Sequence, residues 1–349
     1  MAFRTVELNG FRSYKKAKFS LHPKLTLVIG KNGSGKTNLL ESLYVLSATK
    51  SWRARDPLLL NETSPHWRLA AEADKKQLQI RYQPGRPKQI IIDGKRQRPE
   101  NYIGRYPAVL FEPGSLEIVA GPPDARRRFL NGLLSNIDNL YLHQLIEYRR
   151  VLKQRNALLR SRATAHINNQ VFAWDVKLVE LAAPIVRARQ QLVAHLQERA
   201  EKLYQQVSQQ PHSLALSYQS RVEGSDYASS LLRQLQTRLT TDSLLGFTTA
   251  GPHRDELSIR FKGQPVANVA SRGELRSITL VLKLFELEFI KARTKQTPML
   301  LLDDVLSELD ASRRAYLLEQ LGGTQTVLTT TDLNGISAKL SQDHQTIEL

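Results

Sequence analysis

The sequence predicts an α/β fold whose core is split by an inserted lobe of helices. Near the N-terminus, a short apolar strand runs into a glycine-rich loop and then into a helical pattern. Near the C-terminus, a second apolar strand at 298–302 ends in the paired carboxylates Asp303 and Asp304. Between them, residues 122–245 show the periodicity of long charged helices. We therefore expect a parallel sheet, covered by helices, that joins the two ends of the chain.

The glycine-rich loop has the full spacing of a phosphate-binding P-loop. Its glycines permit backbone dihedrals closed to other residues, so that N–H groups and the helix N-terminus can surround phosphate oxygens. Lys36 is predicted to reach the terminal phosphates, and Thr37 to bind Mg²⁺. The alternative is a glycine-rich surface loop before a helix. The residues predicted to bind the nucleotide, ATP, are Gly30, Lys31, Asn32, Gly33, Ser34, Gly35, Lys36, Thr37 and Asn38.

The strand at 298–302 is predicted to end beside this loop, because ligands of an open α/β sheet lie beyond the carboxyl ends of its strands. Asp303 is then a second Mg²⁺ ligand, and Asp304 is placed to orient or deprotonate the attacking water. Asp304 and Lys36 are the candidate catalytic residues. The alternative is a helix N-cap followed by a loop acid. A parallel strand at 326–330 and an edge strand at 345–349 are expected in the same sheet.

Composition narrows the class of partner. The chain has 349 residues and a formal net charge of +17, which favours a polyanionic partner, with nucleic acid as the first candidate. Cysteine is absent, which excludes a disulfide framework and a cysteine-based metal site. No apolar run approaches the roughly 20 residues that span a bilayer, and no signal-peptide core follows Met1. We expect a cytoplasmic protein without a membrane partner.

Two stretches outside the core carry patterns of their own. Asn9-Gly10 predicts a turn between two N-terminal strands, and alternating apolar residues over 67–92 predict an antiparallel β-meander. Residues 141–159 and 176–207 follow a heptad spacing, which predicts an antiparallel helical pair that projects as an arm. The first of these seams is interrupted only at Arg155. One face of a small bundle is the alternative to an extended coiled coil.

A signature-like Ser271-x-Gly273 heads an apolar helix between the P-loop and the two aspartates, and this order resembles the ABC-type ATPases. In that class, the signature serine and glycine of one subunit close over the γ-phosphate held by another subunit's P-loop. The resemblance implies that Ser271 and Gly273 bind ATP in trans, within an ATP-dependent homodimer. A nucleotide core split by helices is similar to the SMC-like branch. The implied fold is an ABC-type P-loop ATPase core with an antiparallel β subdomain and an inserted helical arm lobe.

Within that branch the chain resembles the RecF family of bacterial recombination mediators, most diagnostically at the run 251–255, Gly-Pro-His-Arg-Asp. The resemblance implies an ATP-dependent DNA-binding protein of recombinational repair and replication restart. Such a protein binds gapped, single-stranded and duplex DNA and, with RecR and RecO, helps RecA load. We divide the chain into the N-terminal half of the ATPase lobe at 1–121, the helical arm lobe at 122–245 and the C-terminal half of the ATPase lobe at 246–349.

Three positions depart from the pattern of ABC-type ATPases. Glu274 stands where the signature usually carries glutamine, and Thr331 stands where transporters carry a switch histidine. The run 111–113, Phe-Glu-Pro, occupies the stretch comparable to the Q-loop. We expect slow hydrolysis of ATP, as in a weak DNA-dependent ATPase that acts as a timing device.

Other functions share part of this pattern. The ATPase subunit of an ABC-type transporter is the main alternative, but it predicts a membrane partner and a switch histidine. A P-loop kinase needs no signature motif, and a structural DNA-binding protein needs no ATP turnover. Charge runs are candidate DNA contacts, although such runs also form solvated faces. The candidates are Arg126, Arg127, Arg149 and Arg150.

Overall fold

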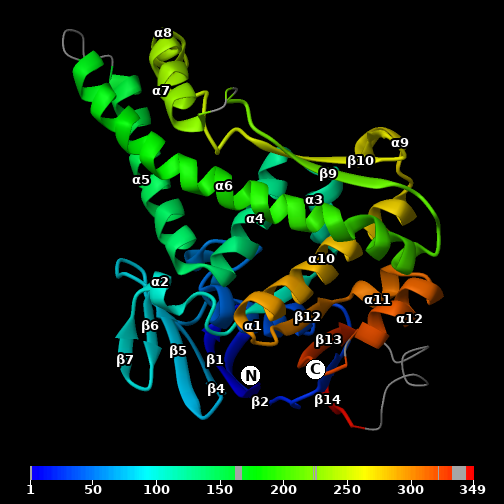
Figure 1. Ribbon diagram of the computed structural model, residues 1–349. Helices are drawn as coiled ribbons and strands as arrows, with labels where there is room; N and C mark the ends of the chain where they lie inside the picture. The colour runs from blue at the N-terminus through cyan, green and yellow to red at the C-terminus, as the bar shows by residue number, and fades with distance from the viewer. Residues whose placement is uncertain (1, 162–166, 223, 225, 321, 332–342) are drawn as a thin grey trace. The chain divides into compact units, whose positions relative to one another are not determined.

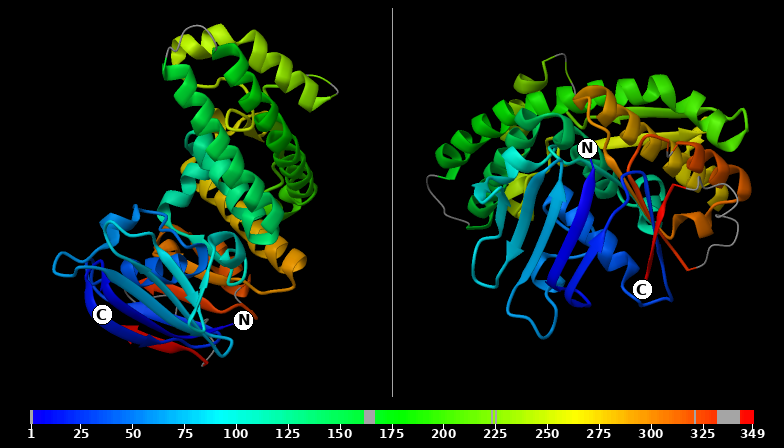
Figure 2. Two further views of the ribbon diagram at one scale, coloured as in Figure 1. Left: turned by 90° about the vertical axis from the view of Figure 1, so that its left-hand side faces the viewer. Right: turned by 90° about the horizontal axis from the view of Figure 1, so that it is seen from below.

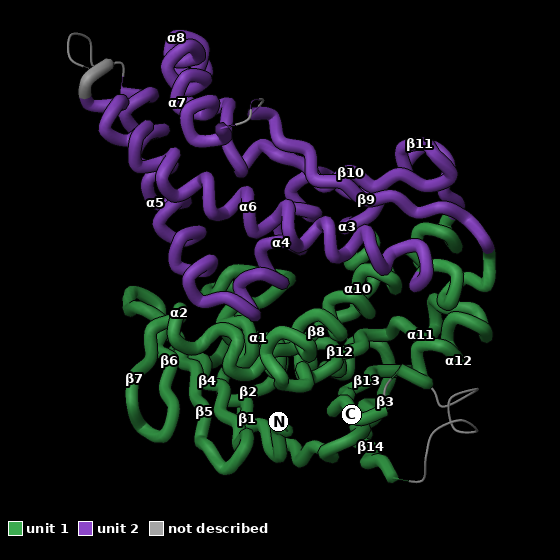
Figure 3. Tube along the Cα trace, in the orientation of Figure 1, with its two compact units in different colours: residues 1–116, 204–210, 272–349 green, residues 117–203, 211–271 purple. Residues whose placement is uncertain are grey.

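The computed structural model describes residues 2–161, 167–222, 224, 226–320, 322–331 and 343–349. The chain forms two compact units, which Figure 3 shows in different colours. The first unit comprises residues 1–116, 204–210 and 272–349, and the second comprises 117–203 and 211–271. A helical insertion therefore divides the first unit, as the sequence predicts. The exact domain boundaries given above remain a prediction.

The first unit contains a five-stranded sheet in the order β14-β3-β13-β12-β8, with every pair parallel. Every residue of β8, β12 and β13 is buried, which fits a parallel sheet covered on both faces. The predicted C-terminal strands are confirmed, including the one at the edge. The strands are β3 (Leu25–Ile29), β8 (Ala108–Phe111), β12 (Met299–Asp303), β13 (Thr326–Thr330) and β14 (Gln345–Glu348).

A six-stranded antiparallel sheet, in the order β2-β1-β4-β5-β6-β7, completes the strands of this unit (Figure 2). Apolar residues alternate along β4 and β5, with Leu69, Leu78 and Ile80 buried on one face. The predicted meander is thus confirmed. The strands are β1 (Phe3–Phe11), β2 (Tyr14–Ser20), β4 (Trp67–Ala73), β5 (Lys76–Tyr82), β6 (Gln89–Ile92) and β7 (Lys95–Gln97).

The turn predicted at Asn9-Gly10 is wrong, because β1 runs through both residues and the chain turns at Arg12 and Ser13. Gly10 has a φ of +64°, and a Cβ at this position would lie 2.2 Å from the carbonyl oxygen of His66. The glycine therefore permits a close approach of backbone rather than a reversal of the chain.

Helix α1 (Lys36–Ala48) lies between the two sheets of the first unit and contacts strands of both (Figure 1). Its leucines explain this position, since Leu39, Leu40 and Leu43 are completely buried in one shared core. The other helices of this unit are η1 (Asp56–Leu59), α2 (Pro99–Tyr102), η2 (Pro113–Leu116), α10 (Arg272–Thr294), α11 (Val305–Glu308) and α12 (Ala311–Gln320).

The second unit is mainly helical, and its two longest helices run in opposite directions in Figure 1. They are α5 (Asn139–Ser161) and α6 (Ile167–Ser208), which confirm the predicted helical pair. The other helices are α3 (Glu117–Ala120), α4 (Pro123–Ile137), α7 (Tyr227–Thr237), α8 (Leu239–Leu245) and α9 (Val266–Val269). Three antiparallel strands complete the unit: β9 (Leu214–Gln219), β10 (Glu256–Phe261) and β11 (Gln264–Pro265).

Arg155, the residue that interrupts the heptad seam, is completely buried. Its Nε lies 2.6 Å from Oδ1 of Asp175, and its Nη1 lies 2.8 Å from Oδ2 of Asp242. Nη1 also donates to the Thr248 hydroxyl at 2.9 Å. The guanidinium thus joins α5, α6 and α8, and the polar residue in the seam holds the arm together.

Candidate nucleotide-binding site

The P-loop follows β3 and precedes α1, as predicted. Two of its glycines, Gly33 and Gly35, have positive φ angles of 83° and 108°. A Cβ at Gly35 would lie 2.7 Å from the Tyr14 hydroxyl, and a Cβ at Gly30 would lie 2.5 Å from the carbonyl oxygen of Leu349. The loop therefore needs glycine at these positions for its conformation and its close packing.

The side chain of Lys36 lies within the loop, with only 8% of the residue exposed. Its Nζ donates to the carbonyl oxygens of Gly30, at 2.6 Å, and of Lys31, at 2.9 Å. In the described part of the chain, the buried Ser34 hydroxyl has no hydrogen-bond partner. A buried polar atom without a partner costs free energy that a bound group can recover. An ammonium, an unpaired hydroxyl and the N-terminus of α1 fit the phosphates of a nucleotide.

The two predicted metal ligands lie together, although 266 positions separate them in the chain. Thr37 donates its hydroxyl proton to Oδ1 of Asp303 at 3.0 Å, and Thr329 donates to the same oxygen at 2.9 Å. Burial raises the pKa of Asp303 above its ordinary value, while these hydroxyl donors oppose the shift. Two adjacent hard oxygen ligands fit Mg²⁺, which keeps most of its own water shell.

Asp304 begins α11 in the left-handed region, with φ of +51°. Its side chain makes no capping hydrogen bond within the described part of the chain, while its backbone N–H donates to the Thr329 hydroxyl at 3.0 Å. A non-glycine residue in this conformation costs about 1 kcal/mol, and such strain is concentrated at functional sites. The carboxylate of Asp304 therefore does not cap the helix, which was the alternative to a catalytic role.

Four residues beside the loop were not predicted as site residues. Tyr14 donates to the Gly35 carbonyl at 3.2 Å, and Thr329 is the neighbour of Asp303 in the register of β12 and β13. Arg53 Nη1 lies 3.5 Å from Oδ1 of Asn38. Arg12 makes two hydrogen bonds of 2.8 Å to Glu41 on α1. Only Thr329 carried a usable signal, because it lies near the carboxyl end of the strand expected in the same sheet as the P-loop strand.

The signature segment begins α10. Ser271 is exposed directly before the helix, and Gly273 lies in its first turn. A Cβ added to Gly273 would lie 3.9 Å from the nearest atoms, the guanidinium nitrogens of Arg313. The packing of its own chain therefore leaves room for a larger residue here. Thr37 and Asp303 meet through a hydrogen bond of their own, in which neither Ser271 nor Gly273 takes part.

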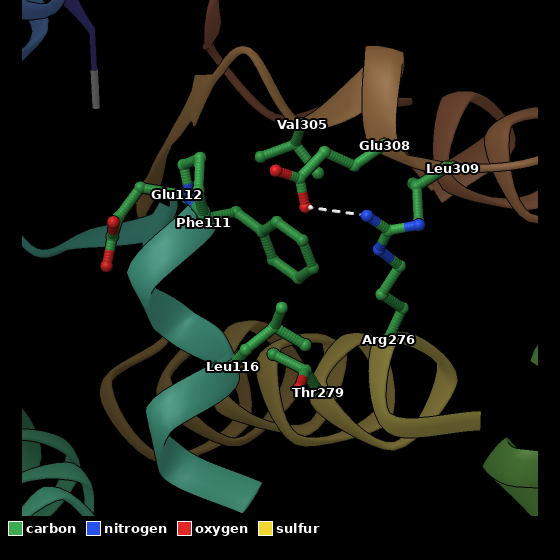
Figure 4. Close-up of a pocket in the computed structure, with 9 residues that line it drawn as sticks. Phe111, Glu112, Leu116, Arg276, Thr279, Val305, Glu308 and Leu309 are labelled. Atoms are coloured by element: carbon green, nitrogen blue, oxygen red, sulfur yellow. Dashed lines mark ion pairs between the residues drawn. The ribbon is translucent and has the colours of Figure 1, made fainter. Parts of the chain in front are cut away.

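An apolar pocket lies between β8, α10 and the segment that follows Asp304 (Figure 4). The ring of Phe111 points into it, whereas Glu112 points away and accepts a hydrogen bond of 2.6 Å from the Gly114 N–H. At its rim, Arg276 and Glu308 form an ion pair of 3.6 Å. This pair links the signature helix directly to α11.

The four candidate DNA-binding arginines lie in the second unit but differ in their surroundings. Arg126 makes hydrogen bonds of 2.7 and 3.1 Å to the carboxylate of Glu256, and Arg127 donates to the Asp255 carbonyl at 3.0 Å. Arg149 and Arg150 are exposed on α5, where Arg150 lies 3.7 Å from Glu147. The first two arginines are thus occupied in joining α4 to β10.

Comparisons with known proteins bear on the family and the fold of this chain. The family model described as "RecF/RecN/SMC N terminal domain" matches residues 2–336. Two relatives are described as "DNA replication and repair protein RecF". The relative from Lachnoclostridium phytofermentans is 34% identical over 340 residues, which cover 95% of this chain and 93% of the relative. The relative from Herpetosiphon aurantiacus is 36% identical over 363 residues, which cover 95% and 94%.

Solved structures extend the likeness to the fold. The recombination mediator protein RecF-ATP of the RecFOR pathway is 29% identical, with a TM-score of 0.89, over 96% of this chain and 93% of that one. An Smc head domain from Pyrococcus furiosus shares the fold with a TM-score of 0.52 at 16% identity, covering 95% and 90%. Among the helices of the described residues, none has both the length and the apolar character needed to cross a bilayer.

Proposed function

Because this chain belongs to the RecF family, we propose that it is an ATP-dependent DNA-binding protein of recombinational repair and replication restart. The hydrogen bond between Thr37 and Asp303, directly beside the P-loop, carries this proposal, because it joins two Mg²⁺ ligands where a triphosphate would lie. Family membership favours this function over a transporter subunit.

Each residue of the site has a defined task in this proposal. Lys36 leaves its two carbonyl partners to bind the terminal phosphates, while Thr37 and Asp303 bind Mg²⁺. ATP bound there would supply the γ-phosphate that the signature segment of a second subunit could contact. Asp304 orients or deprotonates the attacking water, and its strained backbone directs its carboxylate. The departures at Glu274 and Thr331 favour slow turnover.

Ser271 and Gly273 act in trans in this proposal. The space around Gly273 supports it, since a glycine that its own chain does not need is available for close approach by a partner's nucleotide. The homodimer would therefore form only with ATP bound. Each subunit would supply the P-loop of one site and the signature of the other.

The partners follow from the family and from the charge. A net charge of +17 suits gapped, single-stranded and duplex DNA. The related RecF-ATP structure is described as part of the RecFOR pathway, which favours RecR and RecO as partners and RecA as the protein finally loaded. A cytoplasmic location is part of the same proposal.

Sedimentation with and without ATP, on duplex and on gapped DNA, tests this function. Wild-type protein should dimerise only with ATP, and Ser271→Arg should bind ATP yet remain monomeric. Ser20→Arg, an exposed serine at the end of β2, is the matched control and should dimerise normally. A Ser271→Arg protein that dimerises and hydrolyses ATP normally would exclude the trans arrangement.

Mixing two inactive variants sharpens the test. A heterodimer of Ser271→Arg and Lys36→Ala has one site with both defects and one site with neither. It should recover part of the ATPase activity, provided that one intact site suffices for turnover. If the mixture stays inactive while heterodimers form, the two half-sites do not combine as proposed.

A further inference from the structure

The solvent face of the six-stranded sheet carries a row of cations that the P-loop site does not use. Strand alternation directs Leu8, Leu69 and Ile80 into the core. Their sequence neighbours therefore point outward. The pairing register places Lys16 opposite Asn9, Asn9 opposite Arg68, and Arg68 opposite Arg81.

The cations in this row are accessible. Lys16 and Arg81 are exposed, and the side chain of Arg68 is 38% exposed. Neighbouring strands are about 4.8 Å apart, so the three strand steps from Lys16 to Arg81 span roughly 14 Å. A duplex carries roughly one phosphate charge for each 1.7 Å of its axis, so a row of this length can face several phosphates.

The row is costly for the sheet itself, because like charges directly opposite each other on neighbouring strands are destabilising. Arg68 and Arg81 are such a pair. Arg81 donates to Oε1 of Gln89 at 2.6 Å, so its partner on the other side is a neutral amide. A face that served only for solubility would gain by alternating its charges.

One carboxylate lies among these cations. Glu7 is 2.9 Å from the Lys18 ammonium and 3.8 Å from the Arg68 guanidinium. The hydrogen bond from Lys18, together with the charges of Lys18, Arg68 and Lys16, holds the pKa of Glu7 below its ordinary value. Glu72 lies on the same face of β4, but it pairs with Thr5 and Gln77. It is therefore outside the row from Lys16 to Arg81, which remains positive.

We propose that Lys16, Arg68 and Arg81 bind the phosphate backbone of DNA on the solvent face of this sheet. The inference rests on the proposed DNA-binding function and gives it a location different from the four arginines of the second unit. Contacts to phosphates fix position and carry no sequence information, so binding to the row should be independent of sequence.

Salt titration of DNA affinity tests the row, with a short labelled duplex and Arg68→Gln/Arg81→Gln protein. The double variant should bind more weakly, and the log–log slope of affinity against salt should fall by roughly one for each cation removed. Its unfolding midpoint should stay the same or rise, since the like-charge pair is gone. That combination separates a binding role from a structural one.

Two further variants complete the experiment. Lys95→Gln removes the same charge from the same sheet, but Lys95 pairs with the buried Ile92, so its side chain belongs to the opposite face. It should keep the wild-type slope. Glu7→Gln removes the one carboxylate beside the row and should strengthen binding.

The outcomes are distinguishable. If wild-type protein binds DNA and the double variant keeps the same affinity and salt slope, the row does not bind DNA, and the proposed function still stands. Wild-type protein that binds no DNA at low salt would overturn both. The double variant removes two charges and Lys95→Gln removes one, so a slope change only twice as large for the double variant would show an effect of net charge alone and would also overturn the proposal.

Discussion

The helical seam of the second unit and the P-loop of the first unit hold a buried cation in opposite ways. In the second unit, the guanidinium of Arg155 is enclosed by the carboxylates of Asp175 and Asp242. In the first unit, the ammonium of Lys36 rests on two backbone carbonyls, and Asp303 accepts hydrogen bonds from two hydroxyls.

This difference separates structural charges from functional ones. A carboxylate partner neutralises an arginine and fixes its position, which suits a helical unit with a polar core. Neutral partners hold a side chain in place but leave its charge available to a ligand. Arg155 should therefore control stability, and Lys36 and Asp303 should control binding and turnover.

The largest effect should come from Lys36→Ala. The loop loses the ammonium that reaches the terminal phosphates, so ATP binding should fall below detection while the unfolding midpoint changes little. Nucleotide titration measures this, with Lys75→Ala in an exposed turn as the control. Wild-type affinity in the Lys36 variant would contradict the P-loop assignment.

Asp304→Asn should separate binding from turnover. Asp303 still binds the metal, so affinity for Mg·ATP should persist, whereas hydrolysis should slow by roughly 10²- to 10⁴-fold because the attacking water loses its base. The ATP-bound dimer should then persist. Single-turnover kinetics measure this step, and hydrolysis at the wild-type rate would remove Asp304 from catalysis.

Arg155→Met should test the other half of the comparison. It leaves two buried carboxylates without their cation, so the free energy of unfolding should fall by roughly 3–5 kcal/mol. Arg150→Met, on the exposed face of the same helix, should change stability by less than about 0.5 kcal/mol. Denaturant titration compares the two. Equal effects would show that burial of the guanidinium is not what matters.

A smaller effect should appear with pH. Burial lowers the pKa of His253 to about 4. In the neutral ring, Nε2 donates to the Thr248 carbonyl and Nδ1 accepts from the Tyr148 hydroxyl. Unfolded protein binds a proton near pH 6.5, whereas folded protein does not, so stability falls as the pH drops below that value. The loss attributable to this group should be about 2 kcal/mol between pH 7 and pH 5.

The pH effect needs its own control. In His253→Gln protein, the part of the acid sensitivity due to the imidazole should disappear, which urea titrations at both pH values can measure. The same loss in wild type and variant would assign the sensitivity to groups other than this imidazole. Asp255 is not such a group, because burial raises its pKa and protonation at low pH then favours the folded state.

Much of the fold could be predicted because its signals are local. The P-loop needs glycines at fixed spacing, and the buried strands are continuous apolar runs, so both can be recognised within a short window. Even the meeting of Thr37 with Asp303 followed from a rule about where parallel strands end. The heptad spacing gave the helices of the arm for the same reason.

The sequence by itself thus predicted the strand, loop and helix of the P-loop, the helical pair, and the core strands at 298–302, 326–330 and 345–349. Only the tertiary structure decided the partners of the charged side chains. Arg126 pairs with Glu256 across 130 positions, and Arg155 pairs with Asp242 across 87. The physical reason is that backbone dihedrals and apolar periodicity are properties of neighbouring residues, whereas a charge is neutralised by whichever group the folded chain brings within a few ångströms.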